Sequence, residues 1–376
     1  MLDKAKILAQ LDAVADRLFV DCSEQYEQLR AGWHVLARES EMPLWLTQTQ
    51  APWAMPVWHG SCGSVVPVAP SCPAYVVVAS DGSQIYPDKH QGTACFLIQS
   101  ATVSLSYGLA DVPRVQLAAD PNVFVGHDDH DSYATATDFV DCVREELELM
   151  HGTQTACAWV HDLGCADQVL ALFDGSLIFW HLQHKEPQMR ARYVSRYVQQ
   201  LMHLYQERIP AVWYISMPRS KELVHLAQAA LWHDGQVTPG NVVLTHVFDD
   251  DLANIFLEPG NRTIFFEPRF ALCAMYPEPV SPRCAYMHVG AEIVRIEVPA
   301  WMCTDATLLA WVCSVVYDQV TKGNGYPVSL AEAHAHAVVQ GADREFFYYA
   351  VQKMSIARSY ALPGSLKRAK KRMLNF

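Results

Sequence analysis

The sequence predicts a mixed α/β domain, because two buried-strand patterns end in the same tripeptide and an amphipathic helix lies between them. Val76–Ala79 is a β-branched apolar run typical of a buried strand, and it leads into Asp-Gly-Ser at Asp81–Ser83. Val169–Phe173 leads into a second Asp-Gly-Ser at Asp174–Ser176. Between them, Thr137–Met150 carries apolar residues on one helical face. Because Asp-Gly-Ser is typical of turns, we expect each aspartate to lie where a core strand ends.

These two aspartates are candidates for a metal site. Two such strands can place Asp81 and Asp174 side by side at one edge of a sheet, where close carboxylates repel each other unless a cation lies between them. The cation that suits such a site is hard and prefers oxygen ligands, which points to Mg²⁺ or Mn²⁺. Asp-Gly-Ser is also common as a plain turn, so spacing alone favours a structural role.

Length and composition bound the class of protein. The 376 residues are 51% hydrophobic and 18% charged, enough for one large domain or two small ones with a sizeable core. The net charge of −12 argues against a protein coated by nucleic acid, but not against a nuclease, which needs only a local basic channel. The eleven cysteines are scattered, and Met1–Lys6 lacks the apolar segment of a signal peptide. We therefore expect a cytoplasmic protein with reduced thiols and no membrane span.

The N-terminal residues differ in character from the rest. Residues 2–38 have apolar side chains at helical spacing, which predicts a helical arm. Residues 43–73 carry six prolines and three tryptophans, which indicates either an ordered irregular segment or a surface that docks a partner. We therefore divide the chain into an arm with a Trp/Pro-rich segment, residues 1–73, and a second domain, residues 74–376.

The second domain alternates predicted strands and helices. We expect strands at 94–99, 101–107, 156–161, 211–217, 263–266, 285–289 and 293–298, and helices at 137–150, 189–207, 304–317 and 329–336. In the last helix, Ser329 and Glu332 stand at the positions of a capping box.

Three charged segments have two interpretations each. Gly126–Asp131 resembles a metal cluster, although a solvated acidic loop is favoured. The turn after the 211–217 strand can offer Arg219 or Lys221 to a phosphate, or can be plain surface. The basic run Lys367–Arg372 is either a frayed tail or an arm that contacts phosphate.

Several short motifs follow one another between residues 74 and 345. They are Val77–Asp88, Leu97–Gln99, Ser106–Gly108, Arg144 with Glu148, Leu172–Ile178, Ile215–Ser220, Val294–Pro299, and Tyr326-Pro327 followed by Leu330, Ala333 and His334. In their order and separation these motifs resemble the NurA family of nucleases. Ser80 before Asp81, and Gln99 with Ser100, depart from the commonest pattern of that family without touching a proposed ligand.

The resemblance implies an RNase H-like fold with a mixed central sheet flanked by helices. It also implies an enzyme that cuts DNA with Mn²⁺ or Mg²⁺. It also implies a homodimer that works beside HerA, a hexameric ATPase, in DNA end processing and repair. By similarity, Asp81, Glu148 and Asp174 are the acidic metal ligands. His334 is the late histidine of the family, and Tyr326 lies eight residues before it.

For the helical ligand Glu148 an alternative is Glu145, one turn earlier. His336 would face away from His334 on a helix, so we do not assign it to the site. In our hypothesis the acids bind one or two cations, His334 completes the ligand set or protonates the leaving group, and Tyr326 positions a phosphate or packs the histidine.

The function that these expectations predict is 5′–3′ exonuclease and single-strand endonuclease activity on DNA. Three alternatives share most of the same residues. They are a non-catalytic adaptor that loads the ATPase on DNA, a metal phosphohydrolase of small phosphoesters, and a defence nuclease with the same chemistry. A nuclease needs an open basic channel, whereas an enzyme for small phosphoesters needs a closed pocket.

Overall fold

The computed structural model describes residues 2–38, 53, 55–69, 74–88, 95–110, 112–125, 136–236 and 244–359. Its strands are β1 (Val65–Pro67), β2 (Tyr75–Ile85), β3 (Cys95–Tyr107), β4 (Val115–Val125), β5 (Val169–Asp174), β6 (Ala211–Ile215), β7 (Asn261–Thr263), β8 (Pro282–His288) and β9 (Ile293–Pro299). Its α-helices are α1 (Lys4–Ala13), α2 (Ala15–Leu18), α3 (Ser23–Arg38), α5 (Ala136–Leu163), α6 (Pro187–Gln206), α7 (Glu222–His233), α8 (Asp249–Phe256), α9 (Ala306–Lys322), α10 (Val328–Ala337) and α11 (Gly341–Ala357). None of the described helices is both long and apolar enough to cross a membrane.

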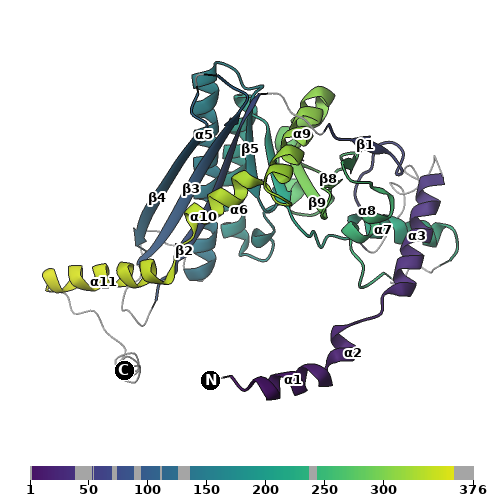
Figure 1. The fold of residues 1–376 in the computed structure, drawn as a ribbon, viewed down its shortest axis with the longest axis horizontal. Helices are drawn as coiled ribbons and strands as arrows, with labels where there is room; N and C mark the ends of the chain where they lie inside the picture. Colours follow the sequence, from purple (N-terminus) through teal and green to yellow (C-terminus); the bar gives the residue numbers. More distant parts are fainter. Residues whose placement is uncertain are drawn as a thin grey trace.

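Within the described residues the strands form one mixed sheet in the order β1-β7-β8-β9-β6-β5-β2-β3-β4. The central strands β2, β5 and β6 run parallel, whereas β3 and β4 continue antiparallel on one side and β9 and β8 on the other. Figure 1 shows the sheet running through the molecule, with α11 at one end and α3 at the other. The predicted α/β class with a mixed sheet flanked by helices is confirmed.

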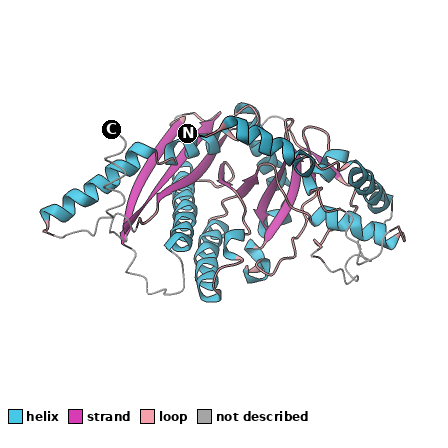
Figure 2. Ribbon diagram, turned by 90° about the horizontal axis from the view of Figure 1, so that it is seen from below, coloured by secondary structure: helices cyan, strands magenta, loops and turns pink. Residues whose placement is uncertain are grey.

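Helices cover both faces of the central strands, and β2 shows why. Val76 and Val78 pack into a core with α5 and α6, whereas Tyr75, Val77 and Ala79 pack into a second core with α9 and α10. Figure 2 shows helices packed beside the strands of the sheet. A strand buried on both faces needs a continuous apolar run, which is the pattern that predicted it.

The N-terminal helices are anchored at α3. Leu29, Trp33 and Leu36 are buried against α7 and α8, and the Trp33 ring stacks on Phe256 with 4.0 Å between ring centroids. The predicted helical arm is interrupted between α2 and α3, where the side chain of Asp21 accepts hydrogen bonds from Ser23. No residue of α1 or α2 is buried. The arm is therefore fixed to the body of the molecule only by its last helix.

The Trp/Pro-rich segment lies in part outside the described residues, as does Trp45. In the part that the structure describes, Trp58 is buried and stacks on Phe266 with 5.5 Å between centroids. Strand β1 pairs with β7 at the edge of the sheet. This part of the segment is therefore ordered against the core.

Two of the strand predictions are wrong, one at residues 156–161 and one at residues 94–107. The 156–161 segment is the last part of α5, because Ala156 and Trp159 lie three residues apart and are buried on one helical face. The two strands predicted at 94–99 and 101–107 are one long strand, β3. A short apolar run does not distinguish a strand from a buried helix, which explains the first error.

The predicted turn at Asp81–Ser83 and the predicted cap at Ser329 are also wrong. The first Asp-Gly-Ser lies inside β2, where Asp81 pairs with Ala101 of β3. Helix α10 begins directly after Pro327, whose φ of −55° already suits a helix. The backbone N–H of Ser329 donates instead to the side chain of Gln319 at 3.2 Å.

Candidate active site

Asp81 and Asp174 lie on neighbouring parallel strands. The register pairs Ser80 of β2 with Phe173 of β5, so the two aspartates are the next residue on each strand. Ala79 of β2 and Leu172 of β5 stand two residues earlier on each strand and pack in the core with α9 and α10, so both aspartates lie on that face of the sheet. Burial raises the pKa of Asp174, and the negative charge of Asp81 adds to that rise. The arrangement that the two tripeptides predicted is therefore present, although only Asp174 stands at a strand end.

Glu148 approaches the same point from α5. The hydroxyl of Ser80 donates to the backbone carbonyl of Glu148 at 2.6 Å, which fixes the helix against β2. A methyl group at Gly82 would lie 2.7 Å from Oε1 of Glu148, closer than carbon atoms come. The missing side chain of Gly82 is therefore what lets the glutamate lie beside Asp81.

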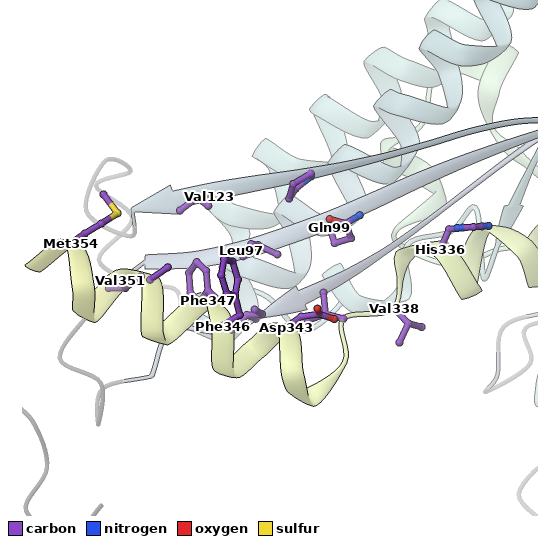
Figure 3. Close-up of a pocket in the computed structure, with 14 residues that line it drawn as sticks. Leu97, Gln99, Val123, His336, Val338, Asp343, Phe346, Phe347, Val351 and Met354 are labelled. Atoms are coloured by element: carbon purple, nitrogen blue, oxygen red, sulfur yellow. The ribbon is translucent and has the colours of Figure 1, made fainter. Parts of the chain in front are cut away.

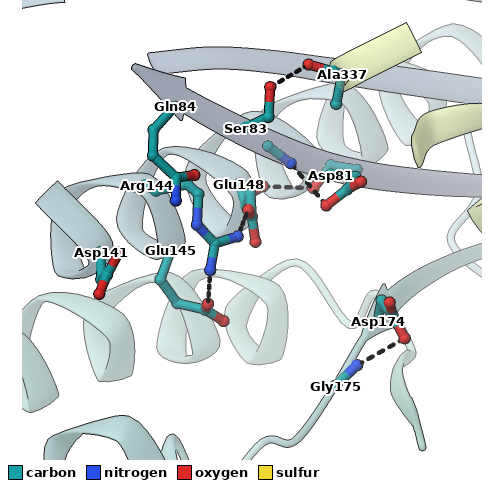
Figure 4. Close-up of polar contacts among 12 residues, drawn as sticks. Asp81, Ser83, Gln84, Asp141, Arg144, Glu145, Glu148, Asp174, Gly175 and Ala337 are labelled. Atoms are coloured by element: carbon teal, nitrogen blue, oxygen red, sulfur yellow. Dashed lines mark hydrogen bonds and ion pairs between the residues drawn. The ribbon is translucent and has the colours of Figure 1, made fainter. Parts of the chain in front are cut away.

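Arg144 joins the acidic residues of the helix. Its guanidinium pairs with Glu148 and lies 3.7 Å from Oε2 of Glu145, as Figure 4 shows. Burial and repulsion by Glu145 raise the pKa of Glu148 well above its usual value, whereas Arg144 lowers it. Burial likewise raises the pKa of Glu145, with Arg144 opposing and Asp81 and Asp174 adding to the rise. The charge of Asp81 therefore acts on both glutamates, and that of Asp174 acts on Glu145.

Two residues from the C-terminal part complete the cluster. Nδ1 of His334 lies 2.7 Å from Oδ2 of Asp81, and 71% of the histidine side chain is exposed. The hydroxyl of Tyr326 hydrogen-bonds to Asp174, which lowers the pKa of that carboxyl and opposes the effect of burial. Leu330 and Ala333 anchor α10 in the core below these contacts. Each aspartate thus has one partner from α10 or the turn before it.

The donor atoms of this cluster suit a hard divalent cation. Four carboxylates, those of Asp81, Glu145, Glu148 and Asp174, face one guanidinium and one histidine. In the described part of the chain, however, no three His, Cys, Asp or Glu side chains are already arranged to hold an ion. The physical reason is visible at Arg144, which draws the two glutamates toward itself. The residues fit a metal because carboxylate oxygens are ligands for hard divalent cations. The carboxylates of Glu145 and Glu148 would have to turn away from Arg144 to reach such an ion.

All five residues that the sequence predicted for the site, Asp81, Glu148, Asp174, His334 and Tyr326, therefore lie together. His336 contacts Glu332 at 4.0 Å and belongs to another surface, as the helical geometry predicted. Glu146 pairs with Arg196 of α6 at 2.8 Å and lies away from the cluster. The Gly126–Asp131 segment and the basic run Lys367–Arg372 lie outside the described residues.

Sequence reasoning missed the network that holds the turn after Asp174. Oε2 of Glu297 accepts hydrogen bonds from Ser176 Oγ and from the Leu177 backbone, each at 2.8 Å. Nε of Arg295 donates to Oε1 of Glu297 at 2.6 Å, and a second guanidinium nitrogen donates to Glu222 at 2.7 Å. All these charges are buried. An arginine and a glutamate two residues apart in an otherwise apolar strand are the signal that could have revealed the network.

A separate pocket of about 630 Å³ lies between the β2–β4 strands and α11 (Figure 3). Its walls are mostly apolar, with Leu97, Val123, Phe347 and Val351 among them. His336 is at its edge, so His334 and His336 serve different surfaces. The pocket lacks the clustered carboxylates of the acidic site and is not a second copy of it.

The mixed sheet and the acidic cluster at the ends of its parallel strands define an α/β protein with a carboxylate-rich site. The chain belongs to the NurA family, because the family model of the NurA domain matches residues 75–339. A comparison with curated proteins found no match.

The solved structures that are similar to the chain include three of NurA proteins. The crystal structure of the NurA nuclease from Sulfolobus solfataricus is 14% identical, with a TM-score of 0.50 over 77% of this chain and 86% of that one. A second NurA crystal structure is 9% identical, with a TM-score of 0.38 over 76% and 90% of the two chains. A NurA structure with manganese is 11% identical, with a TM-score of 0.35 over 88% and 94%. The structure from Sulfolobus solfataricus, with its TM-score of 0.50, supports the assignment of the chain to the NurA fold.

Proposed function

We propose that the chain is a metal-dependent nuclease that hydrolyses phosphodiester bonds in DNA. The observation that carries the proposal is the convergence of Asp81, Glu145, Glu148 and Asp174 with His334 on one edge of the sheet. Membership of the NurA family supports the reaction class. Carboxylates crowded in this way are costly unless a cation offsets their charge, and a phosphodiester enzyme uses that cation for its chemistry.

The residues take the following roles. Asp81, Glu148 and Asp174 hold Mn²⁺ or Mg²⁺, which supplies Lewis-acid polarisation of the phosphate and of the attacking water. His334, exposed beside Asp81, either completes the ligand set or gives a proton to the leaving oxygen. Tyr326 fixes the Asp174 carboxylate through its hydrogen bond. Arg144 holds Glu145 and Glu148 and reduces their mutual repulsion.

The sheet supports an RNase H-like core for this nuclease. Its order β4-β3-β2-β5-β6, with β2, β5 and β6 parallel, places the first acid on the first strand of that unit and the next strand acid beside it. We assign residues 74–376 to this catalytic domain and residues 1–73 to the arm with the Trp/Pro-rich segment.

For the wider role we propose 5′–3′ exonuclease and single-strand endonuclease activity in DNA end processing, beside a HerA-like hexameric ATPase. We also propose a homodimer, working in the cytoplasm. The family resemblance supports these partners. The exposed apolar residues of the edge strand β4 also form a surface to which a protein partner could bind. They are Val115, Leu117, Val123 and Val125 of β4.

The experiment is cleavage of labelled linear single- and double-stranded DNA by the purified chain with Mn²⁺, with Mg²⁺ and with EDTA. Wild type, Asp81→Ala and Asp174→Ala are compared with Glu146→Gln, which alters a glutamate of the same helix that faces Arg196 instead of the site. We expect cutting that needs metal, that both aspartate variants lose and that Glu146→Gln keeps. Absence of cutting with any metal and with the ATPase added would contradict the nuclease and favour the adaptor.

A further inference from the structure

A second pocket adjoins the acidic site at the carboxyl ends of β5 and β6. It measures about 470 Å³, and Gly175 and Ser176, the two residues after Asp174, form part of its wall. Ile215 and Pro218, at the end of β6, form another part. We call it the Arg219 pocket. In parallel α/β sheets, ligands bind outside the carboxyl ends of the strands, and this pocket occupies that place beside a proposed metal ligand.

The charge of the Arg219 pocket differs from that of the acidic site. Arg219 is exposed at its wall, and its guanidinium lies 5.2 Å from the centre of the Phe248 ring. Lys221 donates to the carbonyls of Leu244 and Thr245, which leaves the third donor of its ammonium group available.

The nearby acids do not cancel this charge. Glu222 is the acidic residue among the pocket's lining residues, and its carboxylate is buried in an ion pair with Arg295 at 2.7 Å. The charge of Arg219 also lowers the pKa of Asp250 on α8, a smaller effect than burial, which raises it. In a chain with a net charge of −12, the Arg219 pocket therefore keeps a positive wall suited to an anion.

Part of the pocket lining is aromatic. Trp180 and Phe270 line the pocket and meet edge to face, with 4.6 Å between ring centroids. Aromatic faces bind the bases of an unpaired strand by stacking. A pocket of this volume falls in the range of about 300–1,000 Å³ that holds a small molecule, such as one nucleotide of a strand. A paired base would bring its partner with it, so the walls favour an unpaired one.

We propose that the Arg219 pocket binds the single-stranded nucleotide adjoining the scissile phosphate, with its phosphate on Arg219 and its base against Trp180. This inference rests on the proposed nuclease function and adds to it how the strand is held. It also implies that the substrate must be unpaired where it enters the site.

The test is binding of a fluorescein-labelled single-stranded oligonucleotide by fluorescence anisotropy in EDTA, where the chain does not cut. Arg219→Gln is compared with Arg208→Gln, because Arg208 is also exposed and also lies over an aromatic ring, 4.9 Å from the centre of Tyr205. We expect Arg219→Gln to weaken binding about tenfold and to reduce the slope of log affinity against log salt by about 0.7, the value for one phosphate contact. Arg208→Gln should leave affinity and slope unchanged. Equal effects of the two variants, or an unchanged slope for Arg219→Gln, would overturn the proposal.

The aromatic wall is tested by Trp180→Leu, which keeps apolar packing and removes the stacking face. Its melting temperature is compared with that of wild type to confirm folding. We expect it to weaken single-stranded binding about tenfold and duplex binding much less. Equal losses on both substrates would show that Trp180 does not receive an unpaired base.

These binding tests distinguish failure of the inference from failure of the proposed function. Cutting by wild type, combined with normal binding by Arg219→Gln, would leave the nuclease standing and remove the pocket from its mechanism. If wild type fails to cut with any metal and with the ATPase added, the nuclease fails, while binding that depends on Arg219 still identifies a nucleotide site.

Discussion

The same tripeptide, Asp-Gly-Ser, occurs twice in the site and adopts two structures. Asp81–Ser83 is extended inside β2 and pairs with β3 along its whole length. Asp174–Ser176 leaves the end of β5, and Gly175 takes the left-handed φ of +86°. The long apolar strand β3 offers the first tripeptide a partner as far as Ile85, whereas the second has none beyond Asp174. Pairing with a distant strand therefore overrides the turn preference of the tripeptide at one position only.

The two serines also differ in what they hold. Ser83 donates to the carbonyl of Ala337 and accepts from the backbone N–H of Val339 at 2.9 Å, so it ties β2 to the segment between α10 and α11. Ser176 donates to Glu297 of β9 at 2.8 Å. Each tripeptide thus supplies a carboxylate to one site and anchors it to a different part of the molecule.

The largest expected effect is common to both tripeptides. Asp81→Asn and Asp174→Asn should each reduce DNA cutting by about 10²–10³-fold, because each removes a carboxylate that would hold the cation, and the cation would offset the negative charge that develops on the phosphate. Both should also lose the rise in melting temperature that Mn²⁺ gives wild type, since binding to the folded state alone is stabilising. Cleavage rates and thermal melts with and without Mn²⁺ measure these effects. A variant that kept full activity would remove its aspartate from the ligand set.

Replacing the glycine of each tripeptide by alanine should have different effects, on activity at Gly82 and on stability at Gly175. In Gly82→Ala the new methyl group meets Glu148 at 2.7 Å and displaces its carboxylate, so we expect kcat to fall about 10²-fold. In Gly175→Ala nothing lies within 4 Å of the new methyl group, and the cost is backbone strain of about 1–2 kcal/mol. Its stability should fall while kcat stays within a few-fold of wild type. Rates and denaturant melts of the two variants would refute the distinction if both lost activity equally.

The serines should give the smallest effects. Ser83→Ala leaves a backbone N–H and a carbonyl without their partner, which costs about 1–3 kcal/mol and loosens the connection to α11. Ser176→Ala costs about 0.5–1.5 kcal/mol, because Glu297 keeps its bonds to Leu177 and Arg295. Hydrogen exchange should locate the first change in α11 and the second in the turn after β5. The reverse assignment would contradict the anchoring described here.

Patterns local in sequence predicted much of the fold. Apolar runs located β2, β5, β6, β8 and β9, and helical spacing located α6, α9 and α10, because burial on one or two faces leaves a direct trace in the sequence. The same signal failed at 156–161, where five apolar residues in six suit a strand or a buried helix equally. The capping-box pattern at Ser329 failed for a different reason, because the helix begins at Val328, directly after Pro327.

The site was predicted residue by residue, but not its internal contacts. Asp81 and Asp174 follow from strand patterns, whereas Glu148, His334 and Tyr326 came from family resemblance. The bridge from Arg144 to two glutamates depends on how α5 packs against β2, which no local pattern states. The support that Glu297 gives to Ser176 joins residues 121 positions apart, so it is a property of the folded chain alone.

The pairing of Asp81 with His334 also spans the chain, since the two residues are 253 positions apart. During synthesis the N-terminal parts of a protein emerge and fold first, at about 5–20 residues per second. The β2–β3–β4 meander can form early from neighbouring segments, but α10 leaves the ribosome only after the 253 positions between Asp81 and His334 have been made. A nascent chain therefore carries its first acid without its histidine. The proposed nuclease becomes competent to cut only after α10 has been synthesised and has brought His334 to Asp81.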